Sequence, residues 1–160
     1  DMGDKDAQFK LGEFYNSGKG VEKNLTEALK WTQKAAGQGQ VSAQYNLGRK
    51  YDTGEGVKKD TKQAVKWYSA AAGQGHVMAM YNLAYLYMKG EGVAKNPDKA
   101  IAYLKQASEK GDAESQFVLG NIYRQGKYVN KDMAVARQWY EKAAAQGHEK
   151  AKEALANLWL

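Results

Sequence analysis

A single pattern that recurs every 36 residues constrains the fold of this chain more than any other feature of its sequence. Between Ala43 and Gly75 the chain reads A-x3-LG-x2-Y-x2-G-x-GV and then, after an aspartate, A-x2-W-x3-AA-x2-G. Shifts of 36 residues in either direction superimpose this pattern on the rest of the chain without an insertion or a deletion. Such a period is typical of a repeat array, in which each unit completes its core against its neighbours.

Each copy contains two apolar runs with helical spacing on either side of a glycine-rich link. In the first run Ala43, Leu47 and Tyr51 recur every four residues and therefore share one face of a helix. In the second run Ala64 and Trp67 begin a similar stripe. The predicted first helices span residues 4–16, 40–52, 76–88, 112–124 and 148–159, and the predicted second helices span 24–36, 60–72, 96–108 and 132–144.

The sequence thus predicts an all-α fold, a solenoid of αα-hairpins with about four and a half 36-residue units. We expect one domain over residues 1–160, with repeats at 3–38, 39–74, 75–110 and 111–146 and a terminal helix at 147–160.

Two local features support the helical boundaries and the packing. The predicted second helices begin at strong N-cap residues, Asn24, Asp60, Asn96 and Asp132. Glu27 and Gln63 follow the first two caps by three residues, where they would complete a capping box. One position of the first helices carries only small residues, Gly12, Gly48, Ala84, Gly120 and Ala156. Because glycine costs about 1 kcal/mol against alanine inside a helix, this position predicts a close approach by the backbone of a neighbouring helix.

Composition limits the chemistry that the chain can use. No apolar run approaches the ~18–20 residues that a membrane-spanning helix needs, so we expect no membrane-spanning helix. Cysteine is absent, which leaves neither disulfides nor thiol chemistry. The net charge is +6, and one lysine per unit (Lys23, Lys59, Lys95 and Lys131) could follow an anionic polymer. Each of these lysines adjoins an N-cap residue, however, so we interpret them as a solvated edge and expect no nucleic-acid partner.

The repeated motif resembles the Sel1-like repeat, a relative of the tetratricopeptide repeat. The resemblance covers residues 3–160, with Ala84, Tyr103 and the pair Lys127-Tyr128 as departures. The last departure replaces a glycine of the link, so we expect the last link to bend differently. The resemblance implies a right-handed superhelix whose concave face is lined by the first helices. It also implies a bacterial scaffold or adaptor that binds other proteins, located in the cell envelope (periplasm) or secreted rather than cytoplasmic. Since the chain begins with Asp1, we expect that any signal peptide has been removed.

Positions of the first helices that face the groove are the candidates for binding a protein or peptide. By the likeness to tetratricopeptide repeats, they are Ser42, Tyr45, Asn46, Arg49, Met78, Tyr81, Asn82, Tyr85, Lys89 and Asn121. Asparagine amides bind peptide backbones, arginine grips carboxylates in a bidentate fork, and tyrosines supply rigid contact area. The aromatic residue at position 45 or 81 recurs in every copy, and it could instead seal neighbouring repeats.

No residues indicate a catalytic, metal or cofactor site. His76 and His148 are the only histidines, and they occupy the same repeat position two units apart, where we expect a turn or an N-terminal helix residue. The Gly-x-Gly links follow no strand and lack the spacing of a phosphate loop, so they are interpreted as turns. A hydrolytic enzyme is an alternative, since some relatives have been credited with such activity, but those are rich in cysteine.

The terminal helix leaves a further alternative open. Trp159 takes the place of Tyr123 one unit earlier and should pack inward. The fifth unit lacks a second helix, so this helix is itself the cap, or the array continues, or the helix pairs with a second copy of the chain. Self-association through it would make the protein an architectural spacer without a groove ligand.

Overall fold

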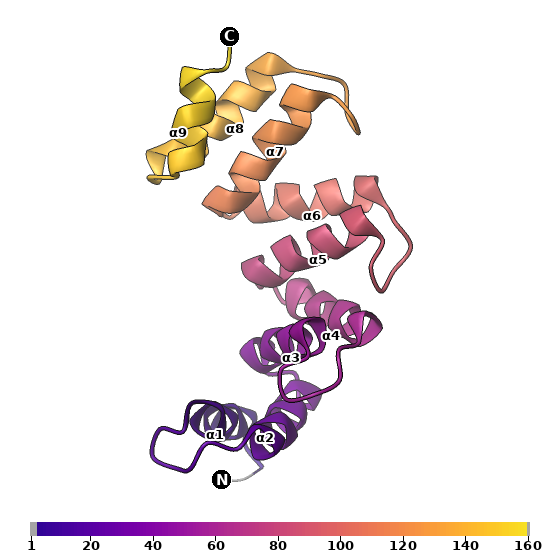
Figure 1. Ribbon diagram of the computed structural model, residues 1–160, viewed down its shortest axis with the longest axis vertical. Coiled ribbons are helices and arrows are strands. Elements are labelled where there is room, and N and C mark those ends of the chain that lie inside the picture. Colours follow the sequence, from indigo (N-terminus) through magenta and orange to yellow (C-terminus); the bar gives the residue numbers. More distant parts are fainter. Residues whose placement is uncertain (1–2, 160) are drawn as a thin grey trace.

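A computed structural model describes residues 3–159; the predicted ends of the domain, Asp1, Met2 and Leu160, lie outside the described residues. Within 3–159 the chain forms nine helices and no strand, which confirms the prediction of an all-α array of helix pairs (Figure 1). The helices are α1 (Lys5–Ser17), α2 (Leu25–Gly37), α3 (Val41–Thr53), α4 (Thr61–Gly73), α5 (Val77–Lys89), α6 (Pro97–Glu109), α7 (Ala113–Gln125), α8 (Met133–Ala145) and α9 (Glu149–Ala156).

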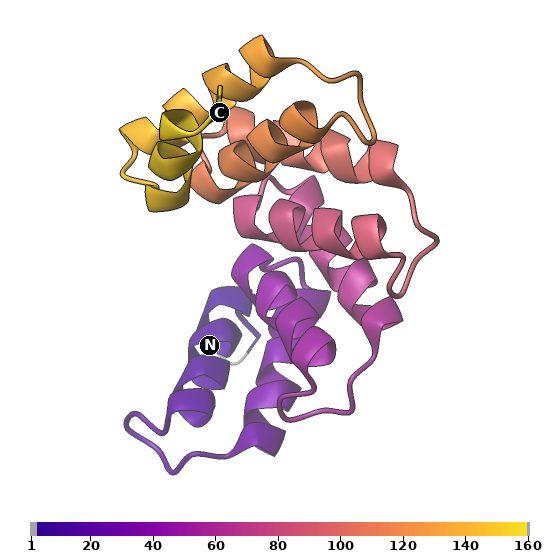
Figure 2. The same cartoon turned by 45° about the horizontal axis from the view of Figure 1, so that its top comes forward.

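The helix pairs stack in chain order along a curved path. Every pair of elements in extensive contact consists of consecutive helices, so each unit is held by its immediate neighbours. The helices α1 and α9 lie at opposite ends of the stack, and the turned view shows an open arc (Figures 1 and 2). First helices of adjacent units also touch directly, as where Lys50 of α3 reaches Asn16 of α1.

The predicted helices begin one residue too early because the predicted ranges included the N-cap. Asn24 and Asp60 accept hydrogen bonds from backbone N–H groups two and three residues later, and Asn96 and Asp132 cap α6 and α8 in a similar way. The capping box predicted at Glu27 and Gln63 is not formed. The cap N–H groups that such a box requires donate instead to Tyr15 and Tyr51, at N–O distances of 2.9 Å. Glu27 accepts from the indole Nε1 of Trp31 at 3.2 Å.

The buried stripe of the second helices differs from the prediction at one position. Ala64 and Ala71 are fully buried, as expected, but Trp67 is only partly buried. The next residue, Tyr68, is buried to 1% exposure. Its equivalents are also buried although they differ in type: Thr32, Leu104 and Tyr140. In α4 the indole ring therefore lies at the edge of the core, whereas the equivalent Trp31 of α2 is buried to 8% exposure. The residue that follows this position is buried in all four second helices.

The small residues of the first helices make room for this second-helix side chain. A Cβ added to Gly48 would lie 2.6 Å from Cδ1 of Tyr68, and a Cβ on Gly120 would lie 2.6 Å from Cε1 of Tyr140. The predicted approach of a neighbouring backbone is therefore wrong for these two glycines, because an aromatic ring is what packs against them. Only Gly12 has both kinds of neighbour, the hydroxyl of Thr32 and backbone atoms of α2.

The last link between the helices of a pair differs from the earlier ones. Gly56 and Gly92, at the same position of the earlier links, have positive φ angles of +72° and +71°. Every described residue with a positive φ is a glycine. Tyr128, at the same position, must therefore follow another backbone path, which confirms the predicted difference in the last link.

The terminal helix is shorter than predicted, since α9 ends at Ala156. Trp159 is 68% exposed, so the prediction that it packs inward is wrong. Its equivalent Tyr87 is covered by Tyr103 of the following α6, with ring centroids 6.0 Å apart. No described helix follows α9, and Trp159 therefore has no such cover.

Candidate functional site

The ten residues predicted to face a groove all lie on α3, α5 and α7, and the structure divides them into internal and accessible groups. Tyr45 belongs to the internal group, because it is 9% exposed and stacks on the His76 ring at a centroid distance of 4.4 Å. Its ring also lies 6.0 Å from that of Tyr68. This geometry favours the interpretation that the aromatic residue seals adjacent units. Tyr81 is partly buried, and burial, with smaller contributions from Glu114 and other charged or ionisable neighbours, raises its pKa.

Asn82 and Asn121 are partly engaged by the buried tyrosines of the second helices. The Tyr140 hydroxyl donates to Oδ1 of Asn121 at 2.6 Å. The Tyr68 hydroxyl donates to Oδ2 of Asp52 at 3.1 Å. Burial raises the pKa of Tyr68 far above its ordinary value, the Asp52 carboxylate adds to this increase, and a hydrogen bond with Asn82 opposes it. Both asparagines therefore have structural partners inside the array.

Met78, Tyr85, Lys89 and Arg49 form the accessible group. Met78 is 58% and Tyr85 52% exposed, although both are large apolar side chains. The Lys89 ammonium lies 5.4 Å from the Tyr85 ring centroid, and the Arg49 guanidinium lies 6.0 Å from that of Tyr45. These cations can rest on aromatic rings while remaining available to a ligand. Ser42 and Asn46 are partly buried on α3.

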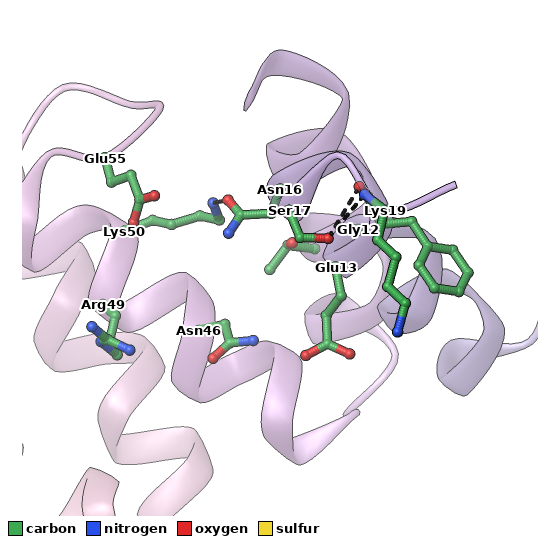
Figure 3. Close-up of a pocket in the computed structure, with 11 residues that line it drawn as sticks. Gly12, Glu13, Asn16, Ser17, Lys19, Asn46, Arg49, Lys50 and Glu55 are labelled. Carbon is green, nitrogen blue, oxygen red and sulfur yellow. Dashed lines mark hydrogen bonds between the residues drawn. The ribbon is translucent and has the colours of Figure 1, made fainter. Parts of the chain in front are cut away.

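A cavity of about 490 Å³ lies between α1 and α3 and includes two of the predicted residues, Asn46 and Arg49 (Figure 3). Its other polar lining was not predicted and comprises Glu13, Asn16, Ser17, Lys19, Thr32, Lys50 and Glu55. Figure 3 shows the Lys50 side chain extending from α3 towards Asn16, with Glu13 and Asn46 below this contact.

The cavity exists because the first unit has small residues at the position where a large side chain packs in other units. Gly12 and Thr32 line it. In the second unit Gly48 faces the ring of Tyr68, which fills the corresponding space. The shorter Thr32 also donates its hydroxyl to the Ala28 carbonyl at 2.7 Å and so stays close to its own helix. The cavity therefore opens beside Thr32, towards α3, where no large side chain of the second helix enters.

Lys50 is the most unusual residue of the cavity. It is 6% exposed, and its Nζ donates to Oδ1 of Asn16 at 3.0 Å. Desolvation lowers its pKa, while the carboxylate of Glu55 acts in the opposite direction. All four other copies carry an apolar residue at this position: Phe14, Leu86, Ile122 and Leu158. Lys50 was not predicted as a site residue because it lies outside the expected groove positions; the signal for it in the sequence is a charged residue at an otherwise apolar repeat position.

The remaining candidates have structural roles or none. His76 and His148 are N-caps of α5 and α9, and their Nδ1 atoms accept from the N–H groups of Ala79 and Ala151 at 3.2 Å. Between residues 3 and 159 no three His, Cys, Asp or Glu side chains are grouped so that they could hold a metal ion. Over the same range no helix is long and apolar enough to cross a membrane.

Comparison with known proteins identifies the repeat. The family model of the Sel1 repeat matches four consecutive segments, residues 5–40, 41–76, 77–112 and 113–148. A protective antigen of uropathogenic Escherichia coli strains, described as displaying an SLR fold, is 40% identical with a TM-score of 0.90; the match covers 93% of this chain and 32% of that one. A Sel1 repeat protein from Oxalobacter formigenes is 39% identical with a TM-score of 0.93, over 99% of this chain and 63% of the other.

A more distant similarity extends to the cysteine rich protein B of Helicobacter pylori. It is 23% identical with a TM-score of 0.60, over 72% of this chain and 96% of that one, and it shows the fold alone. Comparison with curated protein sequences gave no match. This chain spans about a third of the length of the E. coli antigen and less than two thirds of the O. formigenes protein.

Proposed function

Because this chain belongs to the Sel1 repeat family, we propose that it is a protein-interaction scaffold that binds an extended segment of a partner protein on the face formed by its first helices. Sel1 repeat proteins are generally scaffolds for protein interactions, and their repeat is not a catalytic fold. The proposal assigns the chain no chemistry of its own. It also places the binding face on the concave side of the arc and names the residues that would contact the partner.

One observation carries this choice of face. Between residues 3 and 159 the exposed large apolar side chains are Phe14, Met78, Tyr85 and Trp159. The first three lie on first helices, α1 and α5, and none lies on a second helix. An exposed tyrosine with a neighbouring cation is typical of the anchors that dominate protein interfaces. The proposed contacts are Met78, Tyr85, Lys89 and Arg49, with Ser42, Asn46, Asn82 and Asn121 as polar neighbours and Tyr45 and Tyr81 as supports.

Selection from a library of displayed peptides, followed by calorimetry on the enriched peptides, tests this face. The double variant Met78→Ala/Tyr85→Ala should weaken binding at least tenfold, about 1.4 kcal/mol, because it removes the exposed apolar anchors. Arg49→Glu should weaken binding as well. The matched control is Arg137→Glu, which makes the same charge change on the second helix α8, where the arginine pairs with Glu141 on the surface. Unchanged affinity in the double variant, or an equal loss in the control, would move the site away from this face.

A second candidate function is architectural, and Trp159 is the observation that favours it. This side chain is 68% exposed beside α9, and pairing of two copies there would cover it. Analytical ultracentrifugation of the chain and of a Trp159→Lys variant separates the two functions. A mass that rises with concentration in the parent but not in the variant would support self-association. A monomer at all concentrations would contradict the architectural function and favour the scaffold that binds a ligand in its groove.

We also propose that the protein acts in the bacterial envelope or outside the cell. The proposal is supported by the likeness to a protective antigen of E. coli strains. Fractionation of cells that express the full-length protein, with a periplasmic and a cytoplasmic marker, tests it. Recovery with the cytoplasmic marker alone would contradict it.

A further inference from the structure

Lys50 stands in a position where the array otherwise places apolar side chains. The equivalent Leu86, Ile122 and Leu158 are 1%, 8% and 4% exposed, and they pack in the core. Lys50 is buried to the same degree, at 6% exposure, but its ammonium group faces the cavity between α1 and α3. Burial of an ammonium group is unfavourable unless an anion or several acceptors compensate for the lost water.

The described residues supply Lys50 with one amide oxygen and no carboxylate within ion-pair distance. Asn16 is the hydrogen-bond acceptor, and the ion pairs of residues 3–159 are Arg137–Glu141, His148–Glu114 and Lys152–Glu149. An ammonium group has three donors, and one amide oxygen satisfies one of them. Lys50 therefore retains donors for a ligand that enters the cavity.

The other polar groups of the cavity determine which anion would fit. Lys19, Lys50 and Arg49 contribute three positive charges, and Glu13 and Glu55 contribute two negative ones. One net positive charge matches a single carboxylate, whereas the two carboxylates would repel a dianionic phosphate at close range. Arg49 can bind a carboxylate through two parallel N–H groups, and the Asn46 amide adds a neutral donor. The volume of about 490 Å³ admits the residue that carries the carboxylate.

We propose that the cavity between α1 and α3 binds a carboxylate of the partner segment, with Lys50 as its buried cation and Arg49 as its accessible one. The proposal rests on the proposed function, since it names the chemistry of one end of the bound peptide. Met78 and Tyr85 of α5 would then contact apolar residues of the same segment. The carboxylate could be the end of the partner chain or an acidic side chain, and the experiment distinguishes these two sources.

The experiment uses three mixtures of N-acetylated hexapeptides of neutral residues. In the first mixture the C-terminus is amidated and no carboxylate is present; in the second the C-terminus is free; in the third the C-terminus is amidated and one glutamate is included. Each mixture is passed over the immobilised 160-residue chain, and the retained peptides are quantified by mass spectrometry. We expect at least tenfold greater retention of the second or third mixture than of the first. Inorganic phosphate should displace these peptides no better than chloride at equal ionic strength.

Two variants and one control connect retention to the cavity. Lys50→Met introduces an apolar residue where the other copies have one, and Arg49→Gln removes the charge of an exposed residue. Both should abolish the preference for carboxylate-bearing peptides, with folding checked by circular dichroism. Lys66→Met, at an exposed position of α4, should retain the preference.

The outcomes separate this inference from the proposed function. Preference for the second mixture alone identifies a chain-terminal carboxylate, and preference for the third identifies an acidic side chain. A preference that persists in Lys50→Met overturns the assignment of the cavity. Retention of all three mixtures to the same extent, with loss in Met78→Ala/Tyr85→Ala, would overturn the carboxylate pocket while the peptide-binding face stands. No retention of any mixture would contradict both.

Discussion

At the scale of the single residue, Lys50 shows how one substitution in a repeat converts a structural position into a candidate binding position. The four other copies use an apolar side chain there, and the units are stacked in the same way around it. The charged group cannot improve the packing of the core. We expect it to lower stability, and it lines a cavity between the first helices of the first two units.

The first prediction concerns this cost. Replacement of Lys50 by methionine should raise the free energy of unfolding by about 1–3 kcal/mol at pH 7, since it removes a buried polar group. Burial lowers the pKa of Lys50. Between that lowered pKa and the ordinary lysine value of about 10.4, the unfolded chain binds the proton more tightly than the folded chain does. The wild-type stability should therefore rise relative to the variant as the pH increases through this window.

Urea unfolding at pH 7 and at pH 10 measures the two effects. The difference in the free energy of unfolding between Lys50→Met and the wild type should be smaller at the higher pH, because the folded wild type then carries less of the buried charge. Lys66→Met is the control at an exposed position, and its difference from the wild type should not change in this way. An advantage of Lys50→Met that is independent of pH would show that the ammonium group is not desolvated.

The second prediction concerns the pairing of Gly48 with Tyr68. Gly48→Ala places a Cβ 2.6 Å from the ring, and such overpacking costs about 1–3 kcal/mol. The third unit has Ala84 and Leu104 at these two positions, and both are buried. In the background Tyr68→Leu, the same glycine substitution should therefore cost much less. A double-mutant cycle measured by urea unfolding gives the coupling energy between the two positions. Additive effects would show that the cost of Gly48→Ala does not come from the Tyr68 ring.

At the scale of the helix, the sequence predicted what depends on nearby residues. The number and order of the helices, and the caps Asn24 and Asp60, follow from a pattern that is legible within a few turns. The predicted contact from Glu27 or Gln63 back to the N–H group of the cap is not made, because the cap N–H groups donate to tyrosine carbonyls nine residues earlier in the chain. That contact depends on the path of the link, and a local motif does not contain this information.

The candidate site was predicted less completely, for a related reason. Arg49, Met78 and Tyr85 are accessible on the predicted helices, but Tyr45 is buried against His76 of the next unit. A contact between units is not visible in the spacing within one unit. The cavity beside Lys50 depends on the small size of Thr32, and this position was not recognised as buried because its identity changes from copy to copy.

The third prediction concerns the cap of α5. His76 caps this helix through Nδ1, which accepts a hydrogen bond from the Ala79 N–H group only while that nitrogen is unprotonated. Burial lowers the pKa of His76. As the pH falls below the ordinary histidine value of about 6.5, the unfolded chain is protonated first, and stability is lost until the lowered pKa is reached. The loss should be about 1 kcal/mol, the size of a helix cap.

His76→Asn retains a capping side chain that does not titrate. Both proteins should be prepared in the His148→Asn background, because the chain has two histidines and His76 is then the only one that can titrate. Thermal unfolding between pH 7.5 and pH 5 should show a steeper loss for the protein with His76. Parallel curves for the two proteins would mean that the cap does not depend on protonation.

At the scale of the whole molecule, the second and fourth units share features that the first and third units lack. The second and fourth units each combine a glycine with a buried tyrosine, and a histidine caps the first helix that follows: Gly48, Tyr68 and His76 in one case, and Gly120, Tyr140 and His148 in the other. The first unit has Thr32 in place of the tyrosine, and its helix α1 forms the cavity together with α3 of the second unit. Because the stacking is shared but the contents differ, one end of the array can bind a ligand while the rest keeps the helices in place.

The last prediction follows from this stacking of neighbours. Ala151 and Ala154 of α9, together with Leu158 just after it, form a buried cluster with Tyr140 and Ala143 of α8. Deletion of residues 147–160 would expose this cluster, and removal of a buried leucine alone typically costs about 2–5 kcal/mol. Since each helix is held mainly by the helices next to it in the chain, the damage should be greatest in α7 and α8.

Native-state hydrogen exchange measures this effect helix by helix. Amides of α7 and α8 should exchange faster in the truncated chain, whereas amides of α1 to α4 should retain their protection. A chain truncated before Gly3 gives the control at the other end, since it keeps α1 to α9 and the α1 cap Asp4, and it should change little. Equal loss of protection along the whole array would mean that the units unfold as one body, and a ligand at the α1–α3 cavity would then stabilise α8 as strongly as α1. Protection lost only near the deletion would mean that ligand binding at one end leaves the other end free for a second partner.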